Sequence, residues 1–230
     1  MADPNRALFE SVVSLLAPVL DELVFVGGCT TGIFVTDPAA AGIRPTRDVD
    51  AIVDVTSYAQ YTVLSERLRT LGLAEDTLAG APLCRWRRGD VIVDVMPTDA
   101  SVLGFSNRWY PMAIDTAQRL VIAGHRARIV TPALFIATKL EAFHGRGGDD
   151  VFSSHDLEDI VTVVDGRPEI VSDVNAADQS VRAYIASEVR SLVGNPDFIE
   201  ALPGFLLPDA ANQARRPILE ERLRLLAGTA

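Results

Sequence analysis

RPTRDVDAIV at residues 44–53 and VIVDVMP at residues 91–97 are the stretches that decide the fold. Both predict strands, and because side chains alternate between the faces of a strand, Asp48 and Asp50 project from one face. Asp94 lies between valines, where a carboxylate is costly to bury unless it is paired or bound to a cation. If the two strands are neighbours, three carboxylates converge, and a divalent cation would relieve their repulsion.

A glycine pair precedes these strands. LVFVGG at residues 23–28 predicts a buried strand that turns sharply into a short helix. Without Cβ atoms, Gly27 and Gly28 let backbone N–H groups approach an anion closely, and Thr30 adds a hydroxyl. Carboxylates beside such a turn suit two magnesium ions that hold the oxygens of an in-line phosphoryl displacement.

The remaining periodicity predicts an α+β fold, with a small mixed β-sheet flanked by helices and a mainly helical C-terminal region. Helices are expected over residues 7–17 and from residue 58, the latter capped by Thr56 or Ser57, and a hairpin over residues 83–97. From residue 131 the pattern becomes helical. We therefore expect a core over residues 1–120 and a helical region over residues 121–230.

Composition limits the classes of function. The 230 residues carry a net charge of −10, which argues against a protein that coats nucleic acid non-specifically. No apolar run is long enough to span a membrane, no signal pattern opens the chain, and the two cysteines suit a reducing compartment. A cytoplasmic protein without a membrane partner is expected.

Together the segments carry a resemblance. VGGCTTGIF at residues 26–34, followed by RPTRDVDAIV and VIVDVMP, resembles the signature of the DNA polymerase β-like nucleotidyltransferase superfamily. TPALFIATKLEAFHGRG at residues 131–147 and SSHDLEDI at residues 153–160 are similar to two helical motifs of its AbiEii/AbiGii toxin-like branch. The resemblance covers about residues 22 to 165.

The resemblance implies roles for single residues. Asp48 and Asp50 would bind both magnesium ions, and Asp94 would bind the ion that activates the acceptor. Lys139 would contact nucleotide phosphates, and Asp156 would match the acidic residue of the second helical motif. Gly27 and Gly28 would lie at the triphosphate.

Two departures from the family pattern are visible. The second residue of the glycine pair is often serine, and here it is Gly28, so a hydroxyl contact is missing unless Thr30 replaces it. The gap to Asp48 is longer than usual, which we assign to an inserted loop, TDPAAAG at residues 36–42.

The expected function is magnesium-dependent transfer of a nucleoside monophosphate from a nucleoside triphosphate to an acceptor hydroxyl. The resemblance implies a toxin with RNA such as tRNA as acceptor and an antitoxin protein as partner. A small-molecule acceptor, as in antibiotic-modifying nucleotidyltransferases, stays open, as does a non-catalytic nucleotide- or partner-binding module. The helical region is expected to complete the nucleotide site, with Lys139 and Arg146 facing the aspartates.

Some residues allow a plainer interpretation. Lys139 fits an exposed helix lysine equally well, and Asp159 fits a residue that stabilises the helix dipole. Arg44 and Arg47 either meet phosphates or pair with nearby acids.

Overall fold

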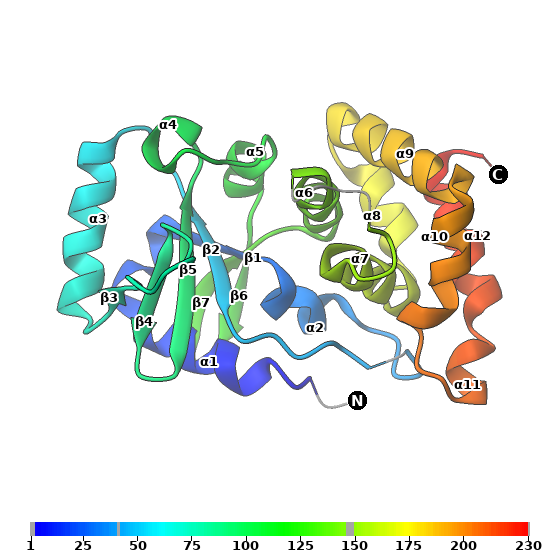
Figure 1. Ribbon diagram of the computed structural model, residues 1–230, viewed down its shortest axis with the longest axis horizontal. Coiled ribbons are helices and arrows are strands. Elements are labelled where there is room, and N and C mark those ends of the chain that lie inside the picture. The colour runs from blue at the N-terminus through cyan, green and yellow to red at the C-terminus, as the bar shows by residue number, and fades with distance from the viewer. Residues whose placement is uncertain (1–2, 41, 146–149, 230) are drawn as a thin grey trace. The chain divides into compact units, whose positions relative to one another are not determined.

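The computed structural model describes residues 3–40, 42–145 and 150–229 (Figure 1). Its contacts divide the chain into two units, each interrupted in sequence. The sheet unit comprises Pro4–Thr30 and Pro45–Thr131, and the helical unit comprises Met1–Asp3, Thr31–Arg44 and Pro132–Ala230.

A mixed sheet of seven strands, in the order β3-β4-β5-β2-β1-β7-β6, forms the sheet unit. The α+β class expected from the sequence is therefore confirmed. The strands are β1 (Leu23–Val26), β2 (Val49–Val53), β3 (Ala74–Glu75), β4 (Arg85–Arg88), β5 (Val91–Pro97), β6 (Gln118–Ile122) and β7 (His125–Ile129). β2 runs antiparallel to β1 and parallel to β5, and β4 and β5 form the expected hairpin.

The helical elements of this unit are short apart from two. They are α1 (Arg6–Leu15), η1 (Ala17–Glu22), η2 (Gly28–Thr30), α3 (Tyr58–Thr70), α4 (Ala100–Leu103) and α5 (Tyr110–Asp115). The Ser57 side chain caps α3 by accepting a hydrogen bond from the Gln60 backbone N–H.

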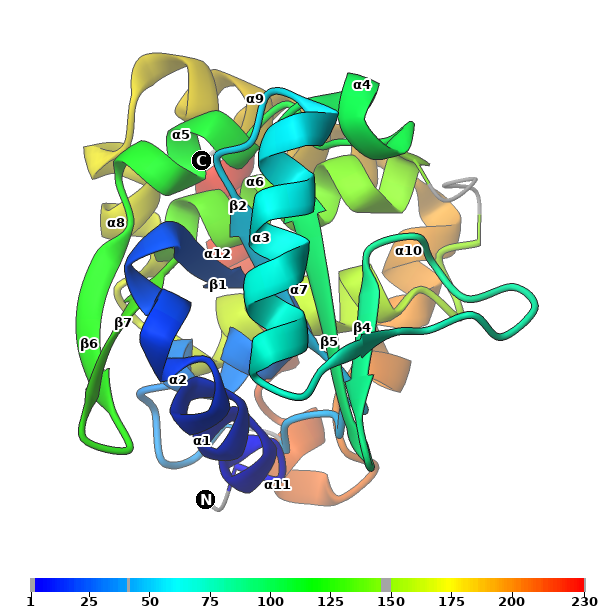
Figure 2. The same ribbon diagram turned by 90° about the vertical axis from the view of Figure 1, so that its left-hand side faces the viewer.

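Helices α1 and α3 cover one face of the sheet (Figure 2). Phe9 of α1 packs edge-on against Phe25, with ring centroids 5.0 Å apart, and Phe25 lies opposite Ala51 in the register of β1 and β2. The Tyr61 hydroxyl of α3 donates to the Val95 carbonyl. Since Asp50 neighbours Ala51 along β2, alternation directs its carboxylate to the opposite face.

That second face is covered in part by α5. The Tyr110 hydroxyl contacts the Met96 sulfur at 3.3 Å, and Met96 lies opposite Ile52 in the pairing of β2 and β5. Trp109 and Tyr110 are both buried, so these aromatic rings close the edge of the core.

The boundary expected after residue 120 passes through β6. Residues 118–129 form an antiparallel pair, β6 with β7, and β7 joins the sheet beside β1. The sheet unit therefore continues to Thr131, because backbone pairing with β1 holds this segment in the sheet.

The helical unit contains eight α-helices and one 3-10 turn among its described residues. They are α2 (Thr31–Phe34), α6 (Pro132–Gly145), α7 (His155–Gly166), α8 (Ile170–Ala176), α9 (Gln179–Gly194), α10 (Pro196–Ala201), η3 (Leu202–Phe205), α11 (Ala210–Gln213) and α12 (Arg216–Ala227). Helices α6 and α12 both contact α7, α8 and α9 (Figure 1).

The segment that was expected to be an inserted loop is packed within the helical unit. The backbone N–H groups of Thr36 and Asp37 both donate to the Gly166 carbonyl at the end of α7, each at 2.9 Å. Asp37 also accepts from the Arg215 guanidinium at 2.7 Å. These contacts explain why residues 31–44 group with the helices although β1 and β2 flank them in sequence.

Candidate functional site

Four residues form a row across the second face of the sheet. Asp94 on β5 lies opposite Asp50 on β2 in a parallel pairing, and opposite Arg85 on β4 in an antiparallel pairing. Asp50 in turn lies opposite Val26, the last residue of β1. Residues that face each other across a sheet project from the same side. The predicted common face of Asp50 and Asp94 is thereby confirmed.

Arg85 joins two of the acids. Its Nε and Nη2 donate to the two oxygens of Asp94 at 2.8 and 2.7 Å, and the same Nη2 donates to Asp48 Oδ2 at 2.7 Å. The Thr46 hydroxyl donates to the other Asp48 oxygen at 2.9 Å. Asp48 and Asp94 are thus held around one positive centre, with bidentate geometry on the Asp94 side.

The electrostatics of the row follow from its burial. The Asp94 side chain is 9% exposed, against 21% for Arg85 and 30% for Asp48. The hydrogen bond and charge of Asp94 raise the pKa of Arg85 above its ordinary value. Two carboxylates, those of Asp48 and Asp94, share one guanidinium, so their combined negative charge exceeds the charge of Arg85 and favours a further cation.

Cys84 lies beside this row without a reactive thiol. Burial, followed by the charges of Asp94 and Asp50, raises the pKa of the Cys84 thiol to about 12. The thiol of Cys84 therefore stays protonated near neutral pH and does not act as a nucleophile.

Gly27 shapes the turn next to Asp50. Its φ of +72° lies in the left-handed region, and a Cβ built there would be 2.0 Å from Asp50 Oδ2. The Asp50 carboxylate therefore lies directly against the Gly27 backbone, in space that only glycine leaves open. Gly28 follows, buried at the start of η2.

Thr30 closes the same turn. Its hydroxyl donates to the Gly27 carbonyl at 2.8 Å, and its backbone N–H donates to the same oxygen at 3.1 Å. Thr30 is fully buried. Its hydroxyl proton is already used to hold the turn, so it does not offer the donor that serine supplies in the family pattern.

The carboxylate oxygens at this site are chemically suited to magnesium. Carboxylate oxygens are the ligands that this hard cation prefers, and Arg85 shows that Asp48 and Asp94 accept one positive centre between them. The expected convergence of all three carboxylates differs from what the structure shows. Over residues 3–40, 42–145 and 150–229, no three aspartate, glutamate, histidine or cysteine side chains are arranged to hold a metal ion. The physical reason is the guanidinium, which lies between Asp48 and Asp94.

Lys139 lies in the helical unit as part of a buried ionic cluster. Its ammonium contacts Asp156 Oδ1 at 2.9 Å and Asp159 Oδ2 at 2.7 Å. Arg44 contacts Asp159 at 3.2 Å and Glu158 at 3.5 Å. Burial alone would lower the pKa of Lys139, but the charges of Asp159 and Asp156 outweigh burial and raise it. The cluster ties α6 to α7 and to the end of the 31–44 segment.

These contacts settle the local environment of several expected residues. Lys139 is 8% exposed, so it is not the solvated helix lysine of the plainer interpretation. Arg44 pairs with acids, as its plainer interpretation held, whereas Arg47 is exposed. Arg146 lies outside the described residues.

The ion pairs of two residues in these clusters were not predicted from the sequence. Arg85 has no role in the sequence-based prediction, although a hairpin with Gly89 and Asp90 at its turn sets Arg88 opposite Val91 and hence Arg85 opposite Asp94. Asp159 gave no comparable signal, because an acid in the first turns of a helix is common whatever its partner.

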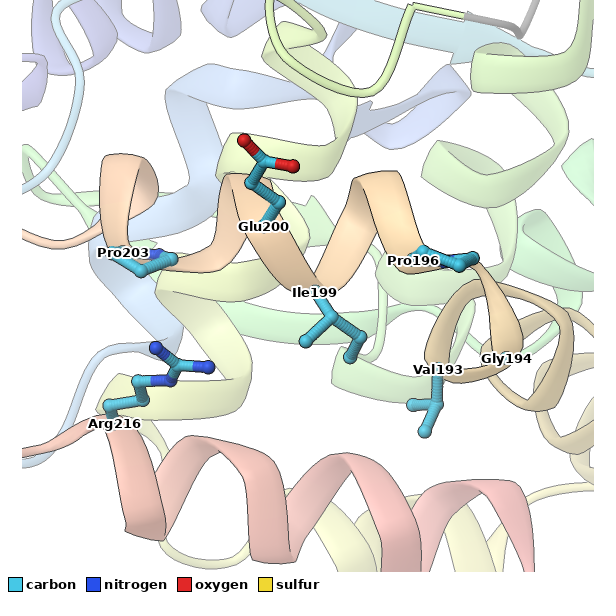
Figure 3. Close-up of a pocket in the computed structure, with 7 residues that line it drawn as sticks. All are labelled: Val193, Gly194, Pro196, Ile199, Glu200, Pro203 and Arg216. Atoms are coloured by element: carbon cyan, nitrogen blue, oxygen red, sulfur yellow. The ribbon is translucent and has the colours of Figure 1, made fainter.

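A pocket of about 550 Å³ lies elsewhere in the helical unit, at α10 and the start of α12. Val193, Ile199 and Pro203 contribute apolar surface (Figure 3). The Glu200 carboxylate points away from Arg216, whose Nε pairs with Glu220 at 2.7 Å instead. The pocket thus lacks a convergent set of polar groups.

The fold of this chain resembles those of two solved structures. The crystal structure of an antigenic nucleotidyltransferase-like protein from Paracoccidioides brasiliensis matches with a TM-score of 0.50 and 22% identity, over 85% of this chain and 92% of that chain. The crystal structure of JHP933 from Helicobacter pylori matches with a TM-score of 0.50 and 14% identity, over 97% and 90%. At such identities the likeness shows that the fold is shared with these two proteins, and no more.

Two further comparisons add no relative: no protein-family model matches the chain, and no curated protein matches it significantly. Among the described residues, every helix is too short or too polar to cross a bilayer.

Proposed function

We propose that this protein catalyses magnesium-dependent nucleotidyl transfer, moving a nucleoside monophosphate from a nucleoside triphosphate to an acceptor hydroxyl and releasing pyrophosphate. The observation that carries the proposal is the register of Asp50 and Asp94 on neighbouring strands, beside the left-handed Gly27 turn. This arrangement occurs in a nucleotidyltransferase-like fold.

The acidic residues would have different roles. Asp48 and Asp50 would hold two magnesium ions, and Asp94 would hold the ion nearer the acceptor and favour loss of the acceptor proton. Bound magnesium supplies charge neutralisation for the attacking and leaving oxygens. Backbone N–H groups at Gly27 and Gly28 would position the triphosphate, since no Cβ blocks its approach.

Lys139 and Asp156 enter the proposal through the resemblance. An ammonium has three N–H donors, and Asp156 and Asp159 account for two of them. The third would donate to a phosphate oxygen, while the aspartates keep the ammonium charged and oriented.

The acceptor and setting are narrower proposals. The similarity of residues 131–147 and 153–160 to the AbiEii/AbiGii branch supports a cytoplasmic toxin that modifies RNA such as tRNA and is restrained by an antitoxin. The net charge of −10 disfavours broad contact with RNA, so RNA would bind at a confined site. A small-molecule hydroxyl, as in antibiotic-modifying enzymes, is the alternative acceptor.

The test is label transfer. Each nucleoside triphosphate, labelled at the α-phosphate, is incubated with the full chain, magnesium, and either total RNA, purified tRNA or a panel of polyhydroxylated small molecules. Label should enter one acceptor class with release of pyrophosphate, and chelation by EDTA should stop it.

Variants assign the activity to the site. Asp50→Asn should abolish transfer, whereas Asp54→Asn, at an exposed position beyond the end of the same strand, should retain it. Nucleotide binding without transfer to any acceptor would favour the non-catalytic module. Transfer that persists in Asp50→Asn would place the chemistry elsewhere.

A further inference from the structure

Arg85 differs from its neighbours on β4 in what it contacts. Arg87 pairs with Asp76, and Arg88 donates to the Leu71 carbonyl at 3.0 Å. Arg85 instead directs its guanidinium to the acidic row, by which we mean Asp48, Asp50 and Asp94, and makes three hydrogen bonds to Asp94 and Asp48. The register of the hairpin fixes this position, because Arg85 lies directly opposite Asp94.

The guanidinium uses the oxygens that a metal ion would need. Asp48 Oδ2 and Asp94 Oδ2 each lie 2.7 Å from the same Nη2 atom. Magnesium binds oxygen at about 2.0–2.1 Å and repels a guanidinium, so contact of both cations with these two oxygens together is electrostatically unfavourable. Binding of the ion and pairing of Arg85 are therefore in competition.

We infer that Arg85 is a resident counter-cation of the acidic row, which a divalent ion displaces from Asp48 and Asp94. This inference rests on the proposed function, because it takes the row as the metal site. Without metal, Arg85 offsets the repulsion between the carboxylates and keeps Asp94 satisfied in its buried position. With metal, the guanidinium leaves these oxygens, so Arg85 weakens metal affinity and makes the ligand-free site stable.

Metal binding tests the inference without reference to activity. Binding of Mg²⁺ alone is measured by calorimetry and of Mn²⁺ alone by electron paramagnetic resonance, in the wild-type chain and in Arg85→Gln, Arg85→Lys and Arg88→Gln. Arg88→Gln is the matched control, because it removes the same charge from the same strand without touching Asp48 or Asp94.

Arg85→Gln should bind either ion about tenfold more tightly than Arg88→Gln, the change expected when a charged hydrogen-bonded competitor is removed. Arg85→Lys should lie between the two, since an ammonium competes as a point charge and lacks the bidentate contact. Equal or weaker binding by Arg85→Gln, or no binding, overturns the inference.

A second measurement covers the case in which Arg85→Gln fails to fold. The nitrogen-15 signal of Arg85 Nε, assigned by its loss in Arg85→Lys, reports the hydrogen bond to Asp94 in the wild-type chain. It should shift as Mg²⁺ saturates the site. A signal that stays unmoved at saturation shows that the guanidinium is not displaced and refutes the inference.

Label transfer measured in parallel separates the two proposals. Active wild-type protein with no tighter binding in Arg85→Gln rejects the counter-cation and leaves the reaction intact. Tighter binding in Arg85→Gln together with an inactive wild-type chain supports the counter-cation and rejects the reaction.

Discussion

Gly27→Ala is the substitution for which the structure gives the sharpest expectation. The new Cβ would lie 2.0 Å from Asp50 Oδ2, 2.8 Å from its Cγ and 2.9 Å from its Cβ. None of these contacts is tolerable, and the last involves an atom fixed to the backbone of β2. Either the turn or Asp50 must move.

The magnitude has two parts. A non-glycine residue in the left-handed region costs about 1–2 kcal/mol. Steric overlap inside a packed region adds about 1–3 kcal/mol. We therefore expect the free energy of unfolding to fall by about 2–5 kcal/mol. Displacing a catalytic carboxylate by about 1 Å lowers the rate of transfer about a hundredfold.

Urea unfolding and label transfer measure the two effects, and Gly124→Ala supplies the control. Gly124 has a φ of +81°, and nothing lies within 4 Å of a Cβ built there, so the control carries the backbone cost without the overlap. In an Asp50→Ala background the penalty of Gly27→Ala should shrink toward that of the control, because the two atoms nearest the new Cβ are gone.

Equal destabilisation by Gly27→Ala and Gly124→Ala, with transfer unchanged in both, would refute the placement of Asp50 against the turn. A large penalty that the Asp50→Ala background leaves undiminished would show that the overlap lies with another group.

Three further perturbations concern the acidic row, the Lys139 cluster and the ion pair of Asp37 with Arg215. Asp50→Ala should abolish transfer and leave the metal-free melting temperature unchanged or raised, because it removes one of three neighbouring acids; loss of the fold would make the residue structural. Lys139→Ala should raise the nucleotide dissociation constant about tenfold, as expected for a charged contact. It should also lower the free energy of unfolding by about 3–5 kcal/mol in urea, because Asp156 and Asp159 each lose an ion pair with a buried cation. The Arg215 hydrogen bond, and then that of the Ala39 backbone, hold the pKa of Asp37 below its ordinary value. The stability that this carboxylate contributes is therefore present above about pH 3.9, its pKa in the unfolded chain, and is lost as the pH falls through its lower pKa in the folded chain. The urea midpoints of the wild-type chain and Asp37→Asn should therefore converge in acid.

Lys139→Ala needs a control that removes a helix cation without breaking a buried ion pair. Arg224→Ala serves, since Arg224 is exposed and pairs with Glu220 one turn away on α12, and it should change stability by about 0.5 kcal/mol or less. Unaltered nucleotide affinity in a folded Lys139 variant would confine Lys139 to a structural role.

Local sequence patterns were enough to predict how the three aspartates of the sheet unit are arranged along their strands. Alternation along residues 48–50 and 91–97 requires Asp48, Asp50 and Asp94 to lie on defined faces, and the turn residues Gly89 and Asp90 set the hairpin register. These features depend on neighbours a few residues away, so they can be predicted from the local sequence.

Other features depend on partners far apart in the chain. Residues of β6 are mostly exposed, so apolar and polar side chains alternate little along this segment. The segment is a strand because it pairs with β7, which lies beside β1. Likewise, no local pattern places residues 31–44 with the helices, because the contacts that hold Asp37 come from Gly166 and Arg215.

The sequence alone determined which groups we propose for the chemistry: an acidic row on a strand face, a glycine turn beside it, and a lysine on an apolar helix. Only the tertiary structure decided what each charge meets, Arg85 with Asp48 and Asp94, and Lys139 with Asp156 and Asp159. A residue type and its spacing fix the direction of a side chain within its own element. The partner of a buried charge is fixed by which elements pack together, because that packing excludes water and leaves the charge to the nearest opposite group.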